Sequence, residues 1–159
     1  MIADTINQKI AMALKAGEKT RLSTLRMLSS ALNYEKIAKQ HDLSEEEELV
    51  VVRKEAKKRQ DAIEAFTQAQ GKSTSSSEES LREKLNQEEE ELKILKEFLP
   101  AEMSDDELQK LVEEAVKETG ISEIKDMGRV IGVVMGKAKG RADGKKVAEK
   151  VRQVLGTAH

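Results

Sequence analysis

Residues 125–147 read KDMGRVIGVVMGKAKGRADGKKV, with a glycine at every fourth position from Gly128 to Gly144. A helix turns about 100° per residue, so it places three of these glycines and three basic residues on one face: Lys125, Gly128, Arg129, Gly132, Gly136 and Lys139. The apolar residues of the stretch fall on the other side. Each glycine destabilises a helix by about 1 kcal/mol relative to alanine. Because the glycines accompany the basic face, the pattern indicates that an anion such as a phosphate chain approaches the bare backbone there.

The end of this stretch predicts a turn, from Gly140 to Gly144, followed by a last helix. The N-terminal end of that helix favours an anion, because its first backbone N–H groups point outward. Asp143 has two interpretations: it belongs to the binding turn, or it is the N-cap of the last helix.

The charge of the chain is divided unevenly. Residues 125–152 hold nine Lys or Arg and three acids, a net charge of +6, whereas the whole chain has −2. The other residues therefore have −8. Such a division indicates an anionic partner for the basic end, although a solvated lysine-rich helix surface would give the same count.

The composition predicts an all-helical protein. Charged residues make up 36% of the chain and aromatic residues 2%, with a single proline and few strand formers. There is no cysteine, which excludes disulfides, thiolate metal sites and a cysteine nucleophile. No apolar run approaches the length of a membrane span, and the N-terminus does not resemble a signal peptide. We therefore expect a cytoplasmic protein with no membrane contact.

Helical periodicity predicts an N-terminal helical bundle over residues 1–99 and a three-helix domain over residues 100–159. The first helix has Ile2, Ile6, Ile10 and Leu14 on one stripe and ends near Gly17. A second helix covers residues 20–39. Capping boxes are predicted at Ser44–Glu47, Ser80–Glu83 and Ser104–Glu107.

Four polar features of the first 99 residues also lead to structural predictions. The serine-rich segment 71–80 predicts a flexible loop. Residues 88–91, all glutamate, predict a solvated face. Arg59 falls on an apolar stripe, so it is either a snorkelling stem or part of a half-buried ion pair. The surrounding basic cluster at residues 53–59 is interpreted as a salt-bridged surface, because Glu55 and Arg59 can pair one helical turn apart.

Catalytic chemistry has little support in the sequence. His41 lies in a polar segment and His159 is the last residue, and neither has an evident catalytic partner. The carboxylates sit in runs with helix-surface spacing rather than in apolar surroundings. Nucleotide-binding glycine loops and metalloprotease motifs are not found. We predict no catalytic residue, no metal and no cofactor.

Four segments resemble the GatB/YqeY family: RLSTLRMLSSALNYEKI from Arg21, RQDAIEAF from Arg59, EFLPAEMSDDEL from Glu97 and the glycine-rich stretch from Lys125. The resemblance implies an N-terminal helical domain and a C-terminal module similar to the tail domain of the B subunit of the glutamine-dependent tRNA amidotransferase. That tail contacts tRNA, and family members are often labelled carbon–nitrogen ligases with glutamine as amido donor. The implied RNA-facing residues are Lys125, Gly128, Arg129, Gly132, Lys139, Gly140, Arg141, Asp143 and Gly144.

Three functions follow from these features. The first is a noncatalytic accessory module that binds structured RNA, most simply tRNA, by contacts to its sugar-phosphate backbone. The second is a component of tRNA-dependent amidation, with a protein partner from that machinery or from translation. The third is a helical adaptor, in which another helix packs on the glycines. Solvent-exposed Gly128 and Gly132 would favour RNA over packing within the chain.

Overall fold

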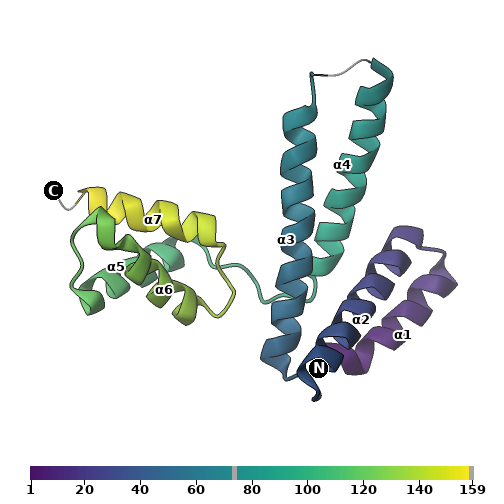
Figure 1. Cartoon of the computed structure of the whole chain (residues 1–159), viewed down its shortest axis with the longest axis horizontal. Helices are drawn as coiled ribbons and strands as arrows, with labels where there is room; N and C mark the ends of the chain where they lie inside the picture. The colour runs from purple at the N-terminus through teal and green to yellow at the C-terminus, as the bar shows by residue number, and fades with distance from the viewer. Residues whose placement is uncertain (73–74, 158–159) are drawn as a thin grey trace. The chain divides into compact units, whose positions relative to one another are not determined.

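The computed structural model describes residues 1–72 and 75–157, and every regular element in them is helical (Figure 1). The protein is therefore all-α, as the composition predicts. In chain order the elements are α1 Ile2–Ala16, α2 Lys19–Lys39, α3 Glu45–Ala69, α4 Ser75–Lys96, α5 Asp105–Thr119, the 3₁₀ turn η1 Ile124–Asp126, α6 Met127–Ala138 and α7 Gly144–Thr157. None of the helices in the described part is both long and apolar enough to cross a bilayer.

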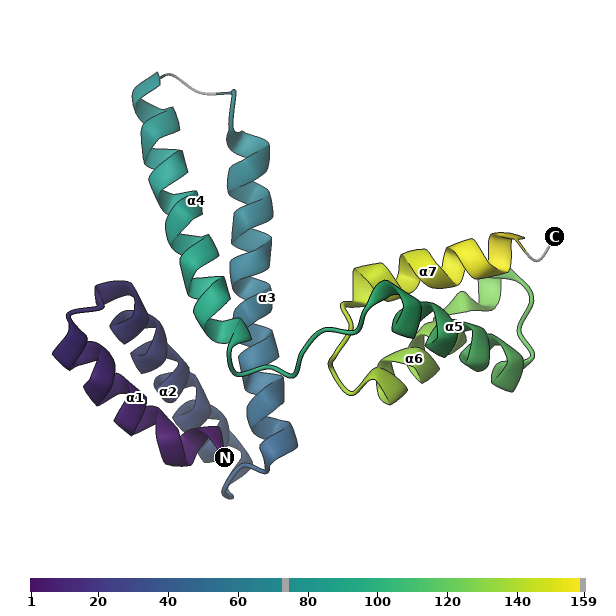
Figure 2. The ribbon, with the colours of Figure 1, turned by 180° about the vertical axis from the view of Figure 1, so that it is seen from behind.

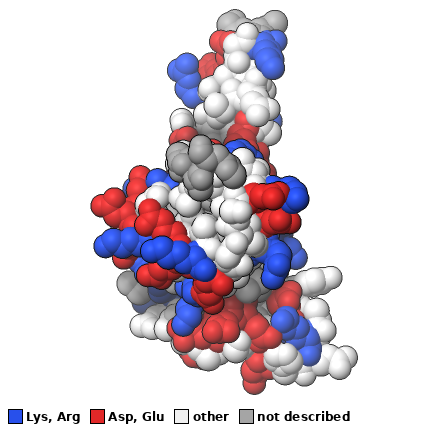
Figure 3. All heavy atoms as spheres, turned by 90° about the vertical axis from the view of Figure 1, so that its left-hand side faces the viewer, with Lys and Arg blue, Asp and Glu red and all other residues white. Residues whose placement is uncertain are grey.

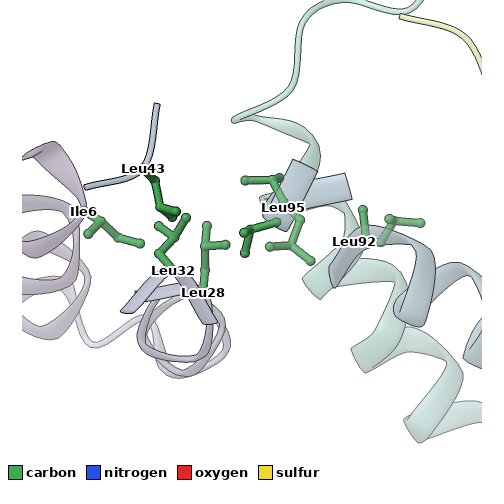
Figure 4. Packing of buried hydrophobic residues seen from close by; sticks show 9 residues of the cluster. Ile6, Leu28, Leu32, Leu43, Leu92 and Leu95 are labelled. Atoms are coloured by element: carbon green, nitrogen blue, oxygen red, sulfur yellow. The ribbon is translucent and has the colours of Figure 1, made fainter. Parts of the chain in front are cut away.

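The contacts divide the chain into two compact units, Met1–Leu99 and Pro100–His159. The first unit consists of two antiparallel helical hairpins, α1–α2 and α3–α4, which can be followed from both sides in Figures 1 and 2. Its buried core draws one or more side chains from each helix and from the α2–α3 connection, among them Ile6, Leu28, Leu32, Leu43, Val52, Leu92 and Leu95. Figure 4 labels six of the residues of this cluster. Full burial of each such side chain stabilises the fold by about 1.5–3 kcal/mol.

The apolar stripe of α1 differs from the predicted one at its end. Ile6 is buried, but Leu14 is 58% exposed and Ala13 takes the core position. The reason is helical geometry. Seven residues make nearly two full turns, so Ala13 lies within about 20° of Ile6, whereas Leu14 lies about 80° away.

Two of the three predicted capping boxes are present. At Ser44–Glu47 and at Ser104–Glu107, the serine hydroxyl accepts a backbone N–H and the glutamate carboxylate accepts the serine N–H. Hydrogen bonds from Lys39 and from the Ser44 backbone lower the pKa of Glu47 to about 2. Gly17 also ends α1 as predicted, in the left-handed conformation that glycine adopts without strain.

The prediction for the serine-rich segment is wrong over most of its length. Helix α4 already begins at Ser75, so Ser80 lies inside the helix and caps nothing. Residues 73 and 74 lie outside the described part. Serine has only a moderate helix propensity, but Glu78 stands in the first turn, where a negative charge interacts favourably with the helix dipole. The helix therefore extends through serines that resemble a linker in composition.

Arg59 of α3 lies among three carboxylates of its own hairpin and also contacts α2 of the other hairpin. Its Nε lies 2.6 Å from Glu91 and 3.6 Å from Glu88, its Nη1 lies 3.9 Å from Glu55, and its Nη2 contacts the sulfur of Met27 at 3.2 Å. The Arg59 side chain is only 11% exposed. Of the two interpretations of Arg59, the half-buried ion pair is the observed one.

Two surface interpretations hold only in part. The predicted Glu55–Arg59 pair is present and the lysines around it are exposed, but Glu55 itself is buried. The glutamate run is likewise divided, because Glu91 is buried. The glutamate run contributes to the interior because α4 turns Glu88 and Glu91, three residues apart, toward α3, while Glu89 and Glu90 face solvent.

A second buried carboxylate belongs to Glu48 on α3. Glu48 is fully buried, and its two oxygens accept hydrogen bonds from the backbone N–H groups of Ile2 at 2.6 Å and Ala3 at 3.0 Å. Met1, the N-cap residue of α1, forms no side-chain cap of its own. The first helix is thus capped by a side chain from the third helix, which the sequence analysis did not anticipate.

The second unit packs α5, α6 and α7 around one core of aliphatic side chains. Fully buried valines on α6 and α7 face valine and alanine on α5. This packing fixes which side of α6 is turned inward: the residues that it buries are Val130, Val134 and Ala138.

Candidate nucleic-acid interface

The glycine face of α6 points away from the core of its unit. Gly128, Gly132 and Gly136 are all exposed. A Cβ added at any of the three would meet no other atom within 4 Å. Packing among the described residues of the second unit therefore does not require these glycines, and the version of the adaptor hypothesis in which this unit itself covers the face does not apply.

Basic side chains accompany the glycines at the start of α6. Arg129 is exposed and has no hydrogen bond or ion pair with any described residue. Lys125 lies in η1, and its Nζ is 2.8 Å from Glu123, with both side chains more than half exposed. Such an exposed pair contributes little to stability and leaves the lysine able to exchange partners. The beginning of α6 thus presents a free guanidinium beside bare backbone.

Arg141 has a structural role in the turn between α6 and α7. Its Nε donates to the carbonyl of Ala101 at 2.9 Å, and its own carbonyl accepts the N–H of Met103 at 2.7 Å. Its Nη2 also lies 3.5 Å from Glu107. The pKa of Glu107 is lowered by the backbone N–H of Ser104 and, after it, by the charge of Arg141. Arg141 therefore fastens the turn to the segment that precedes α5.

The other predicted residues of this turn shape its backbone. Lys139 and Gly140 both adopt positive φ, 48° and 77°, which reverses the chain after α6. The carboxylate of Asp143 accepts the N–H of Lys145 at 3.1 Å, so Asp143 is the N-cap of α7. Gly144 is the first residue of α7 and is half-buried. Of the two interpretations of Asp143, the structure shows the capping one.

Part of the basic charge of α6 and α7 is neutralised within the unit. Lys137 pairs with Glu118 of α5, Arg141 lies near Glu107, and Lys146 lies 3.7 Å from Glu102. The sequence does not indicate these pairs, because their members are 19 to 44 residues apart. One signal was available: α5 holds six acids and two lysines, a net charge of −4. On the face drawn in Figure 3, acidic and basic side chains lie next to one another.

The predicted site therefore has two parts at opposite ends of α6. Lys125, Gly128, Arg129 and Gly132 lie near its beginning. Residues 139–144 form the turn at its end. Arg129 and Lys139 are ten residues apart, which corresponds to about 15 Å along a helix. A ligand that touches both parts must span about this distance, which a single phosphate group does not.

Comparison with protein-family models finds a match over residues 3–155 to the family described as Yqey-like protein. The chain belongs to the YqeY-like family. A search of curated proteins finds no match. The family match covers both units and supports the resemblance stated from the sequence motifs. It extends over all four motif segments, which lie in α2, in α3, in the connection from α4 into α5, and around α6.

Proposed function

We propose that this YqeY-like protein is a noncatalytic accessory module that binds structured RNA, most simply tRNA, through the exposed glycine face of α6. One observation carries the proposal: the three helical glycines are exposed, with open space at each Cβ position, and the unpaired Arg129 stands among them. Each glycine lowers the stability of the helix by roughly 1 kcal/mol relative to alanine. Packing of the helix against its neighbours does not explain why glycine stands at these positions.

The chemistry of the face suits a sugar-phosphate backbone. An absent Cβ lets a bulky ligand approach the helix backbone closely. An arginine guanidinium donates paired hydrogen bonds to phosphate oxygens, which lysine does not do with the same geometry. Contacts of this kind position a nucleic acid without reading its bases. The proposed first contact is therefore the beginning of α6, with Lys125, Gly128, Arg129 and Gly132.

The turn after α6 forms the proposed second contact. Lys139 and the backbone of Gly140 to Gly144 stand at the N-terminal end of α7, where a helix attracts negative charge. Arg141 and Asp143 hold this turn in shape. Their replacement would alter the turn as well as any binding, so they are unsuitable as first probes of the site.

The proposal is tested by salt-dependent titration of the purified chain with tRNA, comparing Arg129→Glu with Arg152→Glu. Both substitutions make the same charge change in the same unit, and both arginines are exposed, but Arg152 lies on α7. We expect R129E to weaken binding about tenfold and to reduce the salt slope by about one, since one phosphate contact is lost. R152E should change affinity much less. Equal losses in the two variants would show that binding depends on overall charge and not on the glycine face.

A helical adaptor is the second candidate, and the same open space on α6 favours it. Small residues let two helices approach closely, so the face could receive a helix from another protein. Such a complex would resist salt, because apolar and backbone contacts would hold it. A salt-insensitive partner complex that is lost in Gly132→Leu, together with unchanged tRNA affinity in R129E, would replace the RNA proposal with the adaptor.

A further inference from the structure

The outward face of α2 holds a set of exposed side chains that the fold does not use. Five residues follow one another at helical spacing along this face: Arg26, Ser30, Asn33, Tyr34 and Ile37. All five are exposed, Tyr34 to 76% and Ile37 to 75%. They lie opposite the buried side of α2, which packs Leu25, Leu28 and Leu32 into the core. Their placement on one face follows from the same periodicity that buries the leucines.

Neither Arg26 nor Tyr34 has a hydrogen bond or an ion pair with any residue in the described part of the chain. An aromatic ring that is buried adds considerably to stability, and one left in water adds almost nothing. Arg21, one turn earlier, is by contrast fully engaged, since it forms two hydrogen bonds with Glu97. The α2 face therefore offers an unused ring and an unused guanidinium.

The face also avoids negative charge within an acid-rich unit. Residues 1–99 contain 19 Asp or Glu, yet the sixteen residues from Lys19 to Tyr34 contain none. The next acid, Glu35, is half-buried and lies 4.0 Å from Lys39. Within α2, Arg26 therefore stands in a stretch that has no carboxylate of its own to repel a polyanion.

We propose that this face of α2 binds unpaired nucleotides of an RNA, with a base stacked on Tyr34 and a phosphate held by Arg26. The two residues are eight apart, a distance of about 12 Å along the helix, so the face accommodates a short single-stranded segment. Ile37 follows Tyr34 by three residues, so the two exposed side chains are neighbours on one side of the helix. The amide of Asn33 can both donate to and accept from a base edge.

The size of the face favours nucleotides over a protein partner. A stable protein interface usually contains 20–30 residues on each side and an apolar centre. Here two apolar side chains stand among polar ones. Stacking of one base on one aromatic ring gives a useful affinity from far fewer residues. The inference extends the proposed RNA-binding function to the N-terminal unit and rests on it, but different residues carry it.

The chain itself supplies the probe, because Tyr34 is its one tyrosine and it has no tryptophan. Tyrosine emission of the full chain therefore reports on this ring alone. We would titrate the chain with short oligouridylate at low salt. We expect saturable quenching of the emission as a base stacks on the ring, with recovery when salt is added.

Variants at Tyr34 separate stacking from general apolar contact. With a labelled oligouridylate and anisotropy as the readout, Tyr34→Leu should bind at least about fivefold more weakly, since the stacking surface is lost. Tyr34→Phe keeps the ring and should bind within about twofold of the parent. The high exposure of the side chain means that neither variant should lose stability, which thermal unfolding checks.

The outcomes distinguish this inference from the proposed function. Quenching that persists in Arg129→Glu supports the α2 face even if the glycine face fails its own test. Binding of oligouridylate with no change in tyrosine emission would overturn the inference and leave the proposed function standing. Absence of any response to oligouridylate, with self-association that is lost in Tyr34→Leu, would also overturn it and assign the face to a protein contact.

Discussion

Glu88 has an environment that its sequence context does not indicate. It belongs to a run of four glutamates, yet its carboxylate shares a partly buried site with Glu91 and Arg59. Burial, and after it the charge of Glu91, raises the pKa of Glu88, while Arg59 opposes the rise. The ionised form of Glu88 is therefore less favourable in the folded protein than in the unfolded chain.

Glu88→Gln should for this reason stabilise the protein at neutral pH. The sign follows from linkage: above the raised folded-state pKa the carboxylate is charged in both states, and the folded state carries the full penalty. As the pH falls through that pKa, Glu88 is protonated first in the folded state and the penalty disappears. The advantage of the variant should consequently vanish near pH 4, roughly the ordinary pKa of glutamate.

Urea unfolding of the parent and of E88Q at the two pH values measures this effect. Glu89→Gln is the matched control, because Glu89 is an exposed neighbour in the same run. It should change the free energy of unfolding by less than about 0.5 kcal/mol at either pH. If the urea midpoint of E88Q were lower than that of the parent at neutral pH, the attraction between the Glu88 carboxylate and Arg59 would outweigh the destabilising effect of burying that carboxylate.

At the scale of single elements, the caps of the helices can be compared directly. Ser44 and Ser80 both precede a glutamate by three residues, and only Ser44 caps a helix. Ser44→Ala should lower the free energy of unfolding by about 1 kcal/mol, whereas Ser80→Ala should leave it unchanged or raise it slightly. Chemical denaturation of both variants tests the assignment, and equal losses would contradict a helix that starts at Ser75.

Two glycines of the second unit, Gly132 and Gly120, can be compared in the same way as the two serines. Gly132 is helical with open space around it, so Gly132→Ala should raise the free energy of unfolding by about 1 kcal/mol. Gly120 has equally open space but a φ of 66°, so Gly120→Ala should lower it by about 1 kcal/mol or more. Thermal unfolding measures both. If the proposed function is right, G132A should also weaken tRNA binding while it stabilises the helix.

Local patterns account for the parts of the fold that were predictable. Helix ends at Gly17 and Gly120 and the two capping boxes depend on residues within four positions of each other, and the sequence shows them directly. The ion cluster at Arg59 and the cap from Glu48 join residues 32 and 46 positions apart. Such pairings depend on how the helices pack against one another, and helical periodicity does not predict them.

For the candidate site too, the sequence predicts the features that depend on nearby residues and not those that depend on distant ones. The exposure of the glycines follows from the position of valines on the opposite side of α6. The fastening of Arg141 to Ala101 could not be seen, because it depends on where the chain passes before α5.

At the scale of the whole molecule, two separate cores suggest separate folding. The second unit buries Val112, Val130, Val134 and Val151 completely within 60 residues, and domains of this size can fold alone. We expect a fragment of residues 100–159 to be helical and to unfold cooperatively, as circular dichroism would show. Val134→Asp should abolish the helicity of the fragment, since it places a charge in the core. A parent fragment without helicity would show that this unit depends on the first.

The cap that Glu48 provides for α1 bears on how the chain folds during its synthesis. A ribosome completes α1 first, but the side chain that satisfies its opening N–H groups is made 45 residues later. At ordinary rates of translation this interval lasts roughly 2 to 9 seconds. Throughout it the opening N–H groups of the nascent α1 lack this partner, so the helix acquires its native cap only after α3 has left the exit tunnel.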